Sequence, residues 1–142
     1  MTPSAHAVSS FIYATIGMVS AIMAGKSFLS KRYLPFHENA AGIPWENLGP
    51  GVQFVLLALM RTSGLGYLVV ASLLTPLPFL TCCTDSLYVT LVVPFISLLF
   101  CVGLFVVNRQ LRTKTGARTP WKGALYAALS IVVGICVSVM RG

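Results

Sequence analysis

Acidic residues are scarce in this sequence, and charge of either sign is low. Only 3 of its 142 residues are Asp or Glu, and charged residues make up 9% of the chain. In soluble globular domains about a quarter of the residues are charged. A chain that is 56% hydrophobic lacks the polar surface such a domain needs, so the composition indicates an integral membrane protein.

The sequence patterns of common enzyme sites are also missing. The chain contains no H-E-x-x-H, G-x-S-x-G or P-loop motif. Its two histidines, His6 and His37, flank the first hydrophobic run from opposite sides and cannot bind one haem iron within a single chain. Catalysis needs positioned acid–base groups or a cofactor. We therefore expect no catalytic residue, no metal and no cofactor in the isolated chain.

The four cysteines form no C-x-x-C pair. Cys82 and Cys83 are adjacent and lie on the predicted outer side of the membrane, where an oxidised tether to a partner is chemically allowed. Cys101 and Cys136 are expected to be small packing residues inside the membrane.

Four apolar runs are each long enough to cross a bilayer. A transmembrane helix needs about 20 mostly apolar residues to cross about 30 Å of hydrocarbon. Such runs occupy residues 8–29, 52–74, 87–107 and 121–140. They lack the alternation of barrel strands, and a helix pairs its own backbone groups. We predict one all-α domain over residues 1–142, a four-transmembrane-helix bundle with up-down topology.

The first run is expected to remain in the mature protein. A signal peptide begins with a basic segment, whereas the first ten residues contain no Lys or Arg, and the run exceeds the length of a signal sequence core.

Basic residues gather on one side of the predicted bundle. The formal net charge is +7, and the segment 75–86 between the second and third runs has no basic residue. Cytoplasmic connections are enriched in Lys and Arg, so we predict that both termini face outward, into the periplasm of a bacterial inner membrane. This placement favours anionic lipid headgroups as partners and argues against nucleic acid. The inner cations are Lys26, Lys31, Arg32, Arg109, Arg112, Lys114, Arg118 and Lys122.

The first inner connection, residues 30–51, is unusual for a loop. It contains Trp45 among other aromatic residues beside Lys and Arg, a combination suited to the headgroup layer. Pro35 and Pro44 forbid a long helix. We predict a short interfacial helix over residues 37–41, and a functional loop that covers the mouth of the bundle is the alternative.

This connection also carries a resemblance to known proteins. The residues Phe36-His37-Glu38, Ala41-Gly42, Trp45, Leu48, Pro50 and Gln53, followed by LLALMR and the glycine-rich residues 63–66, are shared. In these residues the chain resembles a group of small bacterial four-helix integral membrane proteins that have no assigned activity. The resemblance covers the first loop and second span only, and it implies a four-helix fold without any particular chemistry.

Arg61 is the one charged residue placed at mid-membrane depth by the apolar runs. It follows Val52 by nine residues, which corresponds to a depth of about 14 Å along a helix. Insertion of Arg at a helix centre costs about 2.5–3.5 kcal/mol. We expect the bundle to enclose Arg61 and to offer it hydroxyl partners, with Tyr13, Thr15 and Ser97 as candidates.

The role of Arg61 stays open between a structural anchor, a contact to an anion, lipid headgroup or quinone, and a contact to another subunit. His37, Glu38 and Trp45 are the further candidates for ligand or lipid contacts.

Small residues spaced four apart allow close approach of helices in a membrane. We expect them to pack within the bundle, and a homo-oligomer interface is the alternative. The predicted packing residues are Gly17, Ala21, Gly25, Gly64, Gly66, Ser130, Gly134 and Ser138.

Together these features predict a non-catalytic integral membrane protein, either an accessory or interaction subunit of a membrane complex or a small homo-oligomer. A transport pathway for a small molecule or ion lined by Arg61 is the first alternative. A membrane enzyme or a lipid- or quinone-binding module that uses Arg61, His37 and Glu38 is the second.

Overall fold

A computed structural model of the protein describes the backbone of residues 3–83 and 87–140 and the side chains of residues 7–80 and 89–140. The described residues are helical, with no strand among them. The helices are α1 (Pro3–Leu29), α2 (Pro35–Ala41), the 3-10 helix η1 (Trp45–Asn47), α3 (Pro50–Leu74), α4 (Leu77–Cys83), α5 (Leu87–Thr115) and α6 (Trp121–Val139).

Four stretches of helix are long and apolar enough to cross a membrane. They cover Ala7–Leu29, Pro50–Leu80, Val89–Thr115 and Trp121–Val139, close to the four predicted runs. The all-α class is thus confirmed for the described residues, and four candidate membrane-spanning helices are present among them.

Two elements differ from the sequence prediction. The helix α5 continues to Thr115, eight residues past the expected end at 107, because nothing breaks it before Gly116. That glycine has a φ of 71°, and its N–H donates to the Arg112 carbonyl at 2.8 Å, as at a left-handed helix end. The helix α4 lies in the segment 75–86, which we expected to be a plain connection.

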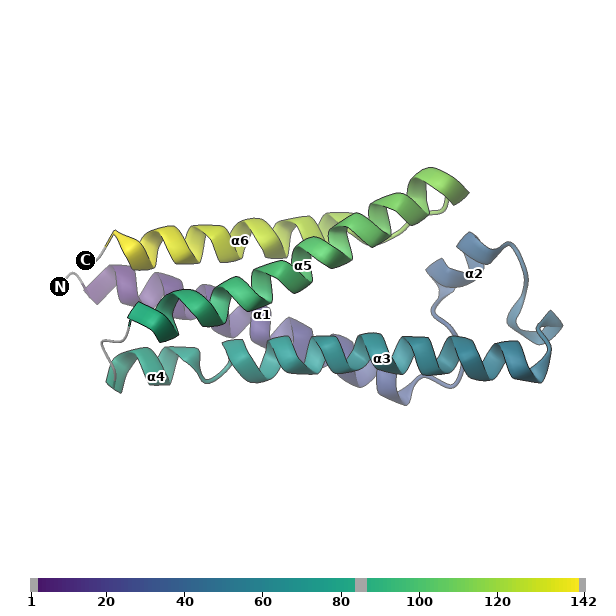
Figure 1. The fold of residues 1–142 in the computed structure, drawn as a ribbon, viewed down its shortest axis with the longest axis horizontal. Coiled ribbons are helices and arrows are strands. Elements are labelled where there is room, and N and C mark those ends of the chain that lie inside the picture. The colour runs from purple at the N-terminus through teal and green to yellow at the C-terminus, as the bar shows by residue number, and fades with distance from the viewer. Residues whose placement is uncertain (1–2, 84–86, 141–142) are drawn as a thin grey trace.

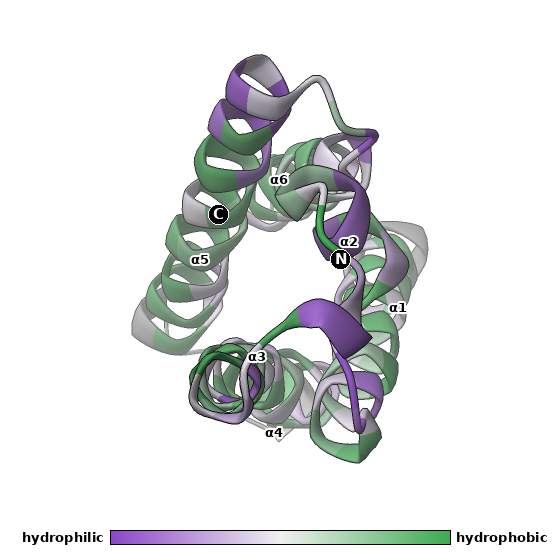
Figure 2. Ribbon diagram, turned by 90° about the vertical axis from the view of Figure 1, so that its right-hand side faces the viewer, coloured by the Kyte–Doolittle hydropathy of each residue, from purple (hydrophilic) through white to green (hydrophobic). Residues whose placement is uncertain are grey.

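The four long helices form an elongated bundle. The helix α1 packs against α3 and α6, and α5 packs against α6 and α3. The start of α1, the end of α6 and all of α4 lie at one end of the bundle, whereas α2 lies at the other (Figure 1). We call these the α4 end and the α2 end. Figure 2 views the bundle from the α2 end, where hydrophilic residues gather around α2 and at the end of α5.

The tightly packed core lies toward the α4 end. Leu74, Leu77 and Ile131 are completely buried there, and Tyr13 joins them in one cluster. Two helix contacts are too close for a side chain. A Cβ built at Gly134 would lie 2.8 Å from a ring carbon of Tyr13, and one at Gly17 would lie 2.7 Å from the Thr75 hydroxyl. Small residues therefore let α6 and α1 approach their neighbours.

At the α2 end, residues 30–51 fold back onto the start of α3. The Tyr33 ring packs edge-on against Trp45, with centroids 4.9 Å apart, and the Tyr33 hydroxyl donates to the Ile43 carbonyl. The Gln53 side-chain amide donates to the carbonyls of Trp45 at 2.9 Å and Leu48 at 3.1 Å. We call this folded segment the inner cap.

The helix of the inner cap begins at Pro35, two residues before the predicted start. Proline is favoured in the first turn, where its missing N–H has no partner to lose. The helix ends at Gly42, whose φ of 67° is left-handed.

Candidate functional site

A cavity of about 400 Å³ lies between the four long helices, on the α2 side of the buried core. Most of its lining is apolar and includes Ile16 and Met23 of α1 and Phe100 and Leu104 of α5. The helix α6 contributes residues with small side chains on one face, among them Gly123 and Ala127. The volume falls in the range of pockets that hold small molecules, about 300–1,000 Å³.

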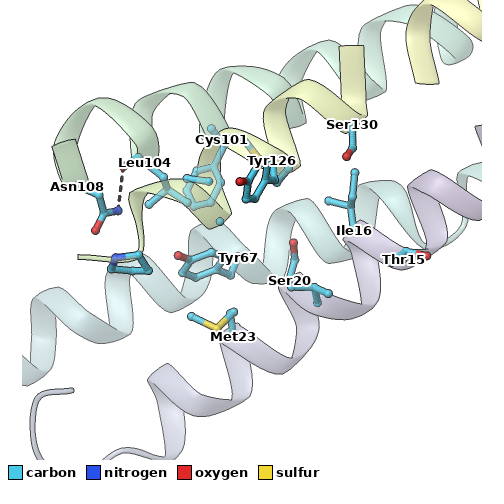
Figure 3. Close-up of a pocket in the computed structure, with 16 residues that line it drawn as sticks. Thr15, Ile16, Ser20, Met23, Tyr67, Cys101, Leu104, Asn108, Tyr126 and Ser130 are labelled. Atoms are coloured by element: carbon cyan, nitrogen blue, oxygen red, sulfur yellow. Dashed lines mark hydrogen bonds between the residues drawn. The ribbon is translucent and has the colours of Figure 1, made fainter. Parts of the chain in front are cut away.

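A few polar groups converge on this cavity. Ser20 of α1, Tyr67 of α3 and Tyr126 of α6 surround one space (Figure 3). Asn108 of α5 lies nearer the α2 end, and its amide donates to the Leu104 carbonyl at 2.8 Å. An apolar wall with a small number of positioned polar groups is the usual composition of a site for a small organic ligand.

The exposed part of the cavity lining lies on α1 and at the start of α6. The exposed lining residues are Thr15, Val19, Pro120, Gly123 and Tyr126. Tyr126 keeps 64% of its surface accessible. Because the outer faces of α1 and α6 would meet lipid, these exposed residues would connect the cavity to the bilayer rather than to water.

The structure corrects the expected environment of Arg61. Its side chain is exposed on α3 and is not enclosed by the bundle. The expected hydroxyl partners are engaged elsewhere. Thr15 donates to the Phe11 carbonyl at 2.8 Å and Ser97 to the Val93 carbonyl at 3.2 Å. An exposed Arg can extend its charge toward headgroups while its stem contacts apolar surface.

The packing places Arg61 relative to the neighbouring helix α1. A Cβ built at Gly64 would lie 2.9 Å from the Ser27 side chain, so α3 at Gly64 is level with the last turn of α1. Arg61 is one turn further toward the α2 end, about 4.5 Å along the helix. It is therefore level with the end of α1, and Figure 1 shows α3 continuing past that end.

His37, Glu38 and Trp45 lie in the inner cap, apart from the large cavity. His37 borders a second cavity of about 340 Å³ between α2 and α3, lined also by Met60 and Ser63. Burial lowers the pKa of the His37 imidazole below its usual value, because burial disfavours the charged form. Burial, with the charges of Glu38 and Glu46, raises the pKa of Tyr33. Arg61 borders neither cavity.

The predicted packing residues have different surroundings. A Cβ at Gly66 would lie 2.3 Å from the Phe100 ring, and Ser138 is buried. Ser130 lines the large cavity. Within the single chain Ala21 is exposed, and a Cβ built at Gly25 would have open space, so the packing role of these two residues stays a prediction. Sequence spacing identifies a ridge on α1 but not the part of it that a neighbour reaches.

The two cysteines with described side chains differ in burial. Cys101 is buried beside the large cavity, whereas Cys136 is exposed on α6, against the expected packing role. The side chains of Cys82 and Cys83 lie outside the described residues.

No protein-family model, no curated protein and no solved structure matches this chain. The resemblance to small four-helix membrane proteins therefore stays a prediction. Sequence reasoning missed the large cavity, because its residues come from four separate helices. The available signal was the run of small residues on one face of α6, which we interpreted as packing alone.

Proposed function

We propose that the protein is a non-catalytic membrane module that binds the long apolar chain of a membrane amphiphile in the large cavity. A lipid acyl chain and the isoprenoid tail of a quinone share this chemistry. The observation that carries the proposal is a cavity of about 400 Å³ with a mostly apolar wall, whose exposed lining residues lie on α1 and at the start of α6. As such a module, the protein would serve as an accessory subunit or as a small homo-oligomer.

Packing physics supports occupancy of this cavity. Protein interiors are close-packed, and an unfilled space loses the dispersion contacts of its lining. Water is a poor filler for the apolar part of the wall, because it finds no hydrogen-bond partners there. The exposed lining residues Val19 and Tyr126 would face the bilayer, so a lipid or quinone chain is the molecule available to fill the cavity.

We further propose that the α2 end faces the cytoplasm and that both termini face outward, across a bacterial inner membrane. The support is the distribution of charge. Lys26, Arg112 and Lys122 are exposed near the α2 end, as the positive-inside rule requires of a cytoplasmic surface.

The alternatives that place Arg61 in a pathway or a ligand site have less support. Arg61 is exposed and lines neither cavity of the single chain, so a pathway through it would need further subunits. His37 and Glu38 lie in the inner cap, so the three residues do not form one site.

Photo-crosslinking tests the proposal directly. The protein is placed in lipid nanodiscs with a phospholipid that carries a diazirine in one acyl chain, is irradiated, and is digested for mass spectrometry. We expect adducts on Met23, Tyr67 and Phe100, which line the cavity, at several times the frequency found on the lipid-facing Val106 and Val107. Adducts that follow surface exposure alone would contradict the proposal.

A matched pair of glycine variants controls this experiment. Gly123 borders the cavity and Gly103 does not, and both have open space for a side chain. Gly123→Leu should reduce crosslinking inside the cavity several-fold. Gly103→Leu should leave it unchanged, because the new side chain points away from the site.

A further inference from the structure

The cavity ends in a group of cations on three helices. Lys26 follows the lining residue Met23 by three positions on α1, and Arg112 follows Asn108 by four positions on α5. On α6, Lys122 precedes Tyr126 by four positions. Residues three and four apart share a helix face. Lys26 and Arg112 are thus one turn beyond these lining residues, toward the α2 end, whereas Lys122 lies between the lining residues Pro120 and Gly123. We call Lys26, Arg112 and Lys122 the cationic rim.

Aromatic contacts position two of these cations. The Arg112 guanidinium lies 5.5 Å from the centre of the Trp121 ring, and the Lys122 ammonium lies 5.9 Å from it. The Trp121 ring in turn packs 6.1 Å from Phe105 of α5, whose ring lies 5.8 Å from the Arg109 guanidinium. Trp at the membrane interface holds a helix at headgroup depth, so the cations around it would also lie at that depth.

The charge of the rim is not balanced by nearby helices. The acidic residues among the described side chains are Glu38 and Glu46, and both belong to the inner cap rather than to α1, α5 or α6. The first turn of α6 carries no acidic residue, although an acid there is favoured by the helix dipole. Arg112 and Lys122 lie against the same ring and repel one another, and an anion between them would remove that repulsion.

We propose that the cationic rim binds a phosphate group of an anionic lipid from the inner leaflet, whose acyl chain occupies the cavity. This inference rests on the proposed function and narrows it, because a quinone has no anionic group for the rim. Arg112 can donate two parallel hydrogen bonds to phosphate oxygens, and the lysines act as point charges. Asn108, between wall and rim, adds a polar group near the glycerol region.

Native mass spectrometry in mild detergent tests the inference. The purified protein is titrated with phosphatidylglycerol and with phosphatidylcholine of identical acyl chains, and the retained lipid is counted. We expect wild type to retain phosphatidylglycerol about tenfold more tightly, because each cation at the surface favours an anionic lipid. The triple variant Lys26→Gln, Arg112→Gln, Lys122→Gln should lose this preference and keep weak retention of phosphatidylcholine.

A second triple variant controls for net charge. Arg61→Gln, Lys114→Gln, Arg118→Gln removes the same number of exposed cations at positions that do not border the cavity, and it should keep the preference. Equal losses in both variants would mean general attraction to the surface and would overturn the inference. Arg112→Lys in the wild-type background retains the charge and should keep part of the preference, which separates charge from a failure to fold.

The outcomes separate the inference from the proposed function. Equal retention of both lipids by wild type, with cavity crosslinks intact, would overturn the proposed binding of phosphate by the cationic rim. The proposed binding of an apolar chain in the cavity would remain. Loss of the crosslinks would remove the proposed function itself. Inorganic phosphate is the probe for a free anion. Displacement of phosphatidylglycerol by millimolar phosphate would point to a soluble anion and overturn the lipid assignment, whereas retention of the lipid supports it.

Discussion

The two ends of the bundle are built differently. Toward the α4 end, Leu74, Leu77 and Ile131 are completely buried, and Gly134 and Gly17 bring helices into contact. Toward the α2 end, α1 and α6 leave a cavity of about 400 Å³. The helices α1 and α6 thus pack closely over one half and diverge over the other, whereas α3 stays in close contact with α1 at Gly64 and with α5 at Gly66.

This difference indicates that stability and binding depend on different halves of the bundle. Lipid tails are as apolar as Leu, so helices associate through close packing rather than through a hydrophobic drive. The half with the close contacts is then expected to hold the fold together. Under the proposed function, the half with the cavity would exchange lipid without unfolding, and we expect substitutions at its exposed residues to have little effect on stability.

Of the variants discussed here, Gly134→Leu should lower the stability of the protein most. The new Cβ would lie 2.8 Å from the Tyr13 ring, and overpacking of this kind costs about 3 kcal/mol. In mild detergent we expect a loss of about 10 °C in Tm by scanning fluorimetry. Gly123→Leu makes the same change on the same helix where space is open. A comparable drop in Tm for both variants would show that the two halves do not differ.

Leu74→Ala should have the next largest effect. Leu74 has 0% of its surface exposed, and truncation of a buried Leu leaves a cavity that costs about 2 kcal/mol or more. Leu65 on the same helix is 52% exposed, so Leu65→Ala should change the free energy of unfolding by less than about 0.5 kcal/mol. Denaturant unfolding in detergent measures both. A larger loss of unfolding free energy for Leu65→Ala than for Leu74→Ala would contradict the proposed role of the buried core.

Hydrophobic length alone predicted much of this fold. A span must cover the hydrocarbon, so the run that ends at Leu74 and the run that starts at Trp121 coincide with α3 and α6. The segment 30–51 was expected to hold a short helix between prolines, and α2 occupies that place. These predictions depend only on the local composition of each segment, which can be read from the sequence.

Other features of the structure depend on contacts between segments that are distant in the sequence. The position of Arg61 relative to the end of α1 followed from the contact between Gly64 and Ser27, and no count along α3 alone contains that relation. The cavity arises because α1 and α6 diverge after Tyr13 meets Gly134. The helix α4 was missed because Pro76 and Pro78 are typical of a loop, although proline is also tolerated in the first turn of a helix.

Gln53→Leu should loosen the inner cap without affecting the bundle. The amide of Gln53 holds the carbonyls of Trp45 and Leu48, and each hydrogen bond contributes about 1 kcal/mol. Hydrogen exchange of residues 43–49 should become faster, while α5 and α6 keep their protection. Gln110→Leu, an exposed position on α5, provides the control. Unchanged exchange in the cap would mean that the ring contact between Tyr33 and Trp45 suffices to hold it.

Acidification should have the smallest effect, and it should be confined to the α2 end. Burial lowers the pKa of His37 in the closed cap, whereas an undocked His37 would have the ordinary value of about 6.5. The open cap therefore binds more protons than the closed one. Closure is fully favoured above pH 6.5 and weakens as the pH falls through 6.5 toward the lowered pKa of the docked residue.

Hydrogen exchange of α2, corrected for the intrinsic pH dependence of amide exchange, measures this opening between pH 7.5 and 5. Wild type should lose protection in α2 on acidification, and His37→Gln should respond little, because its side chain does not titrate. His6→Gln retains the titrating group of the cap and should behave as wild type. An equal response of the packed residues around Leu74 would mean that the α2 end does not open on its own. The cap and the core would then form one cooperative unit, and the contrast between the two ends would concern packing alone.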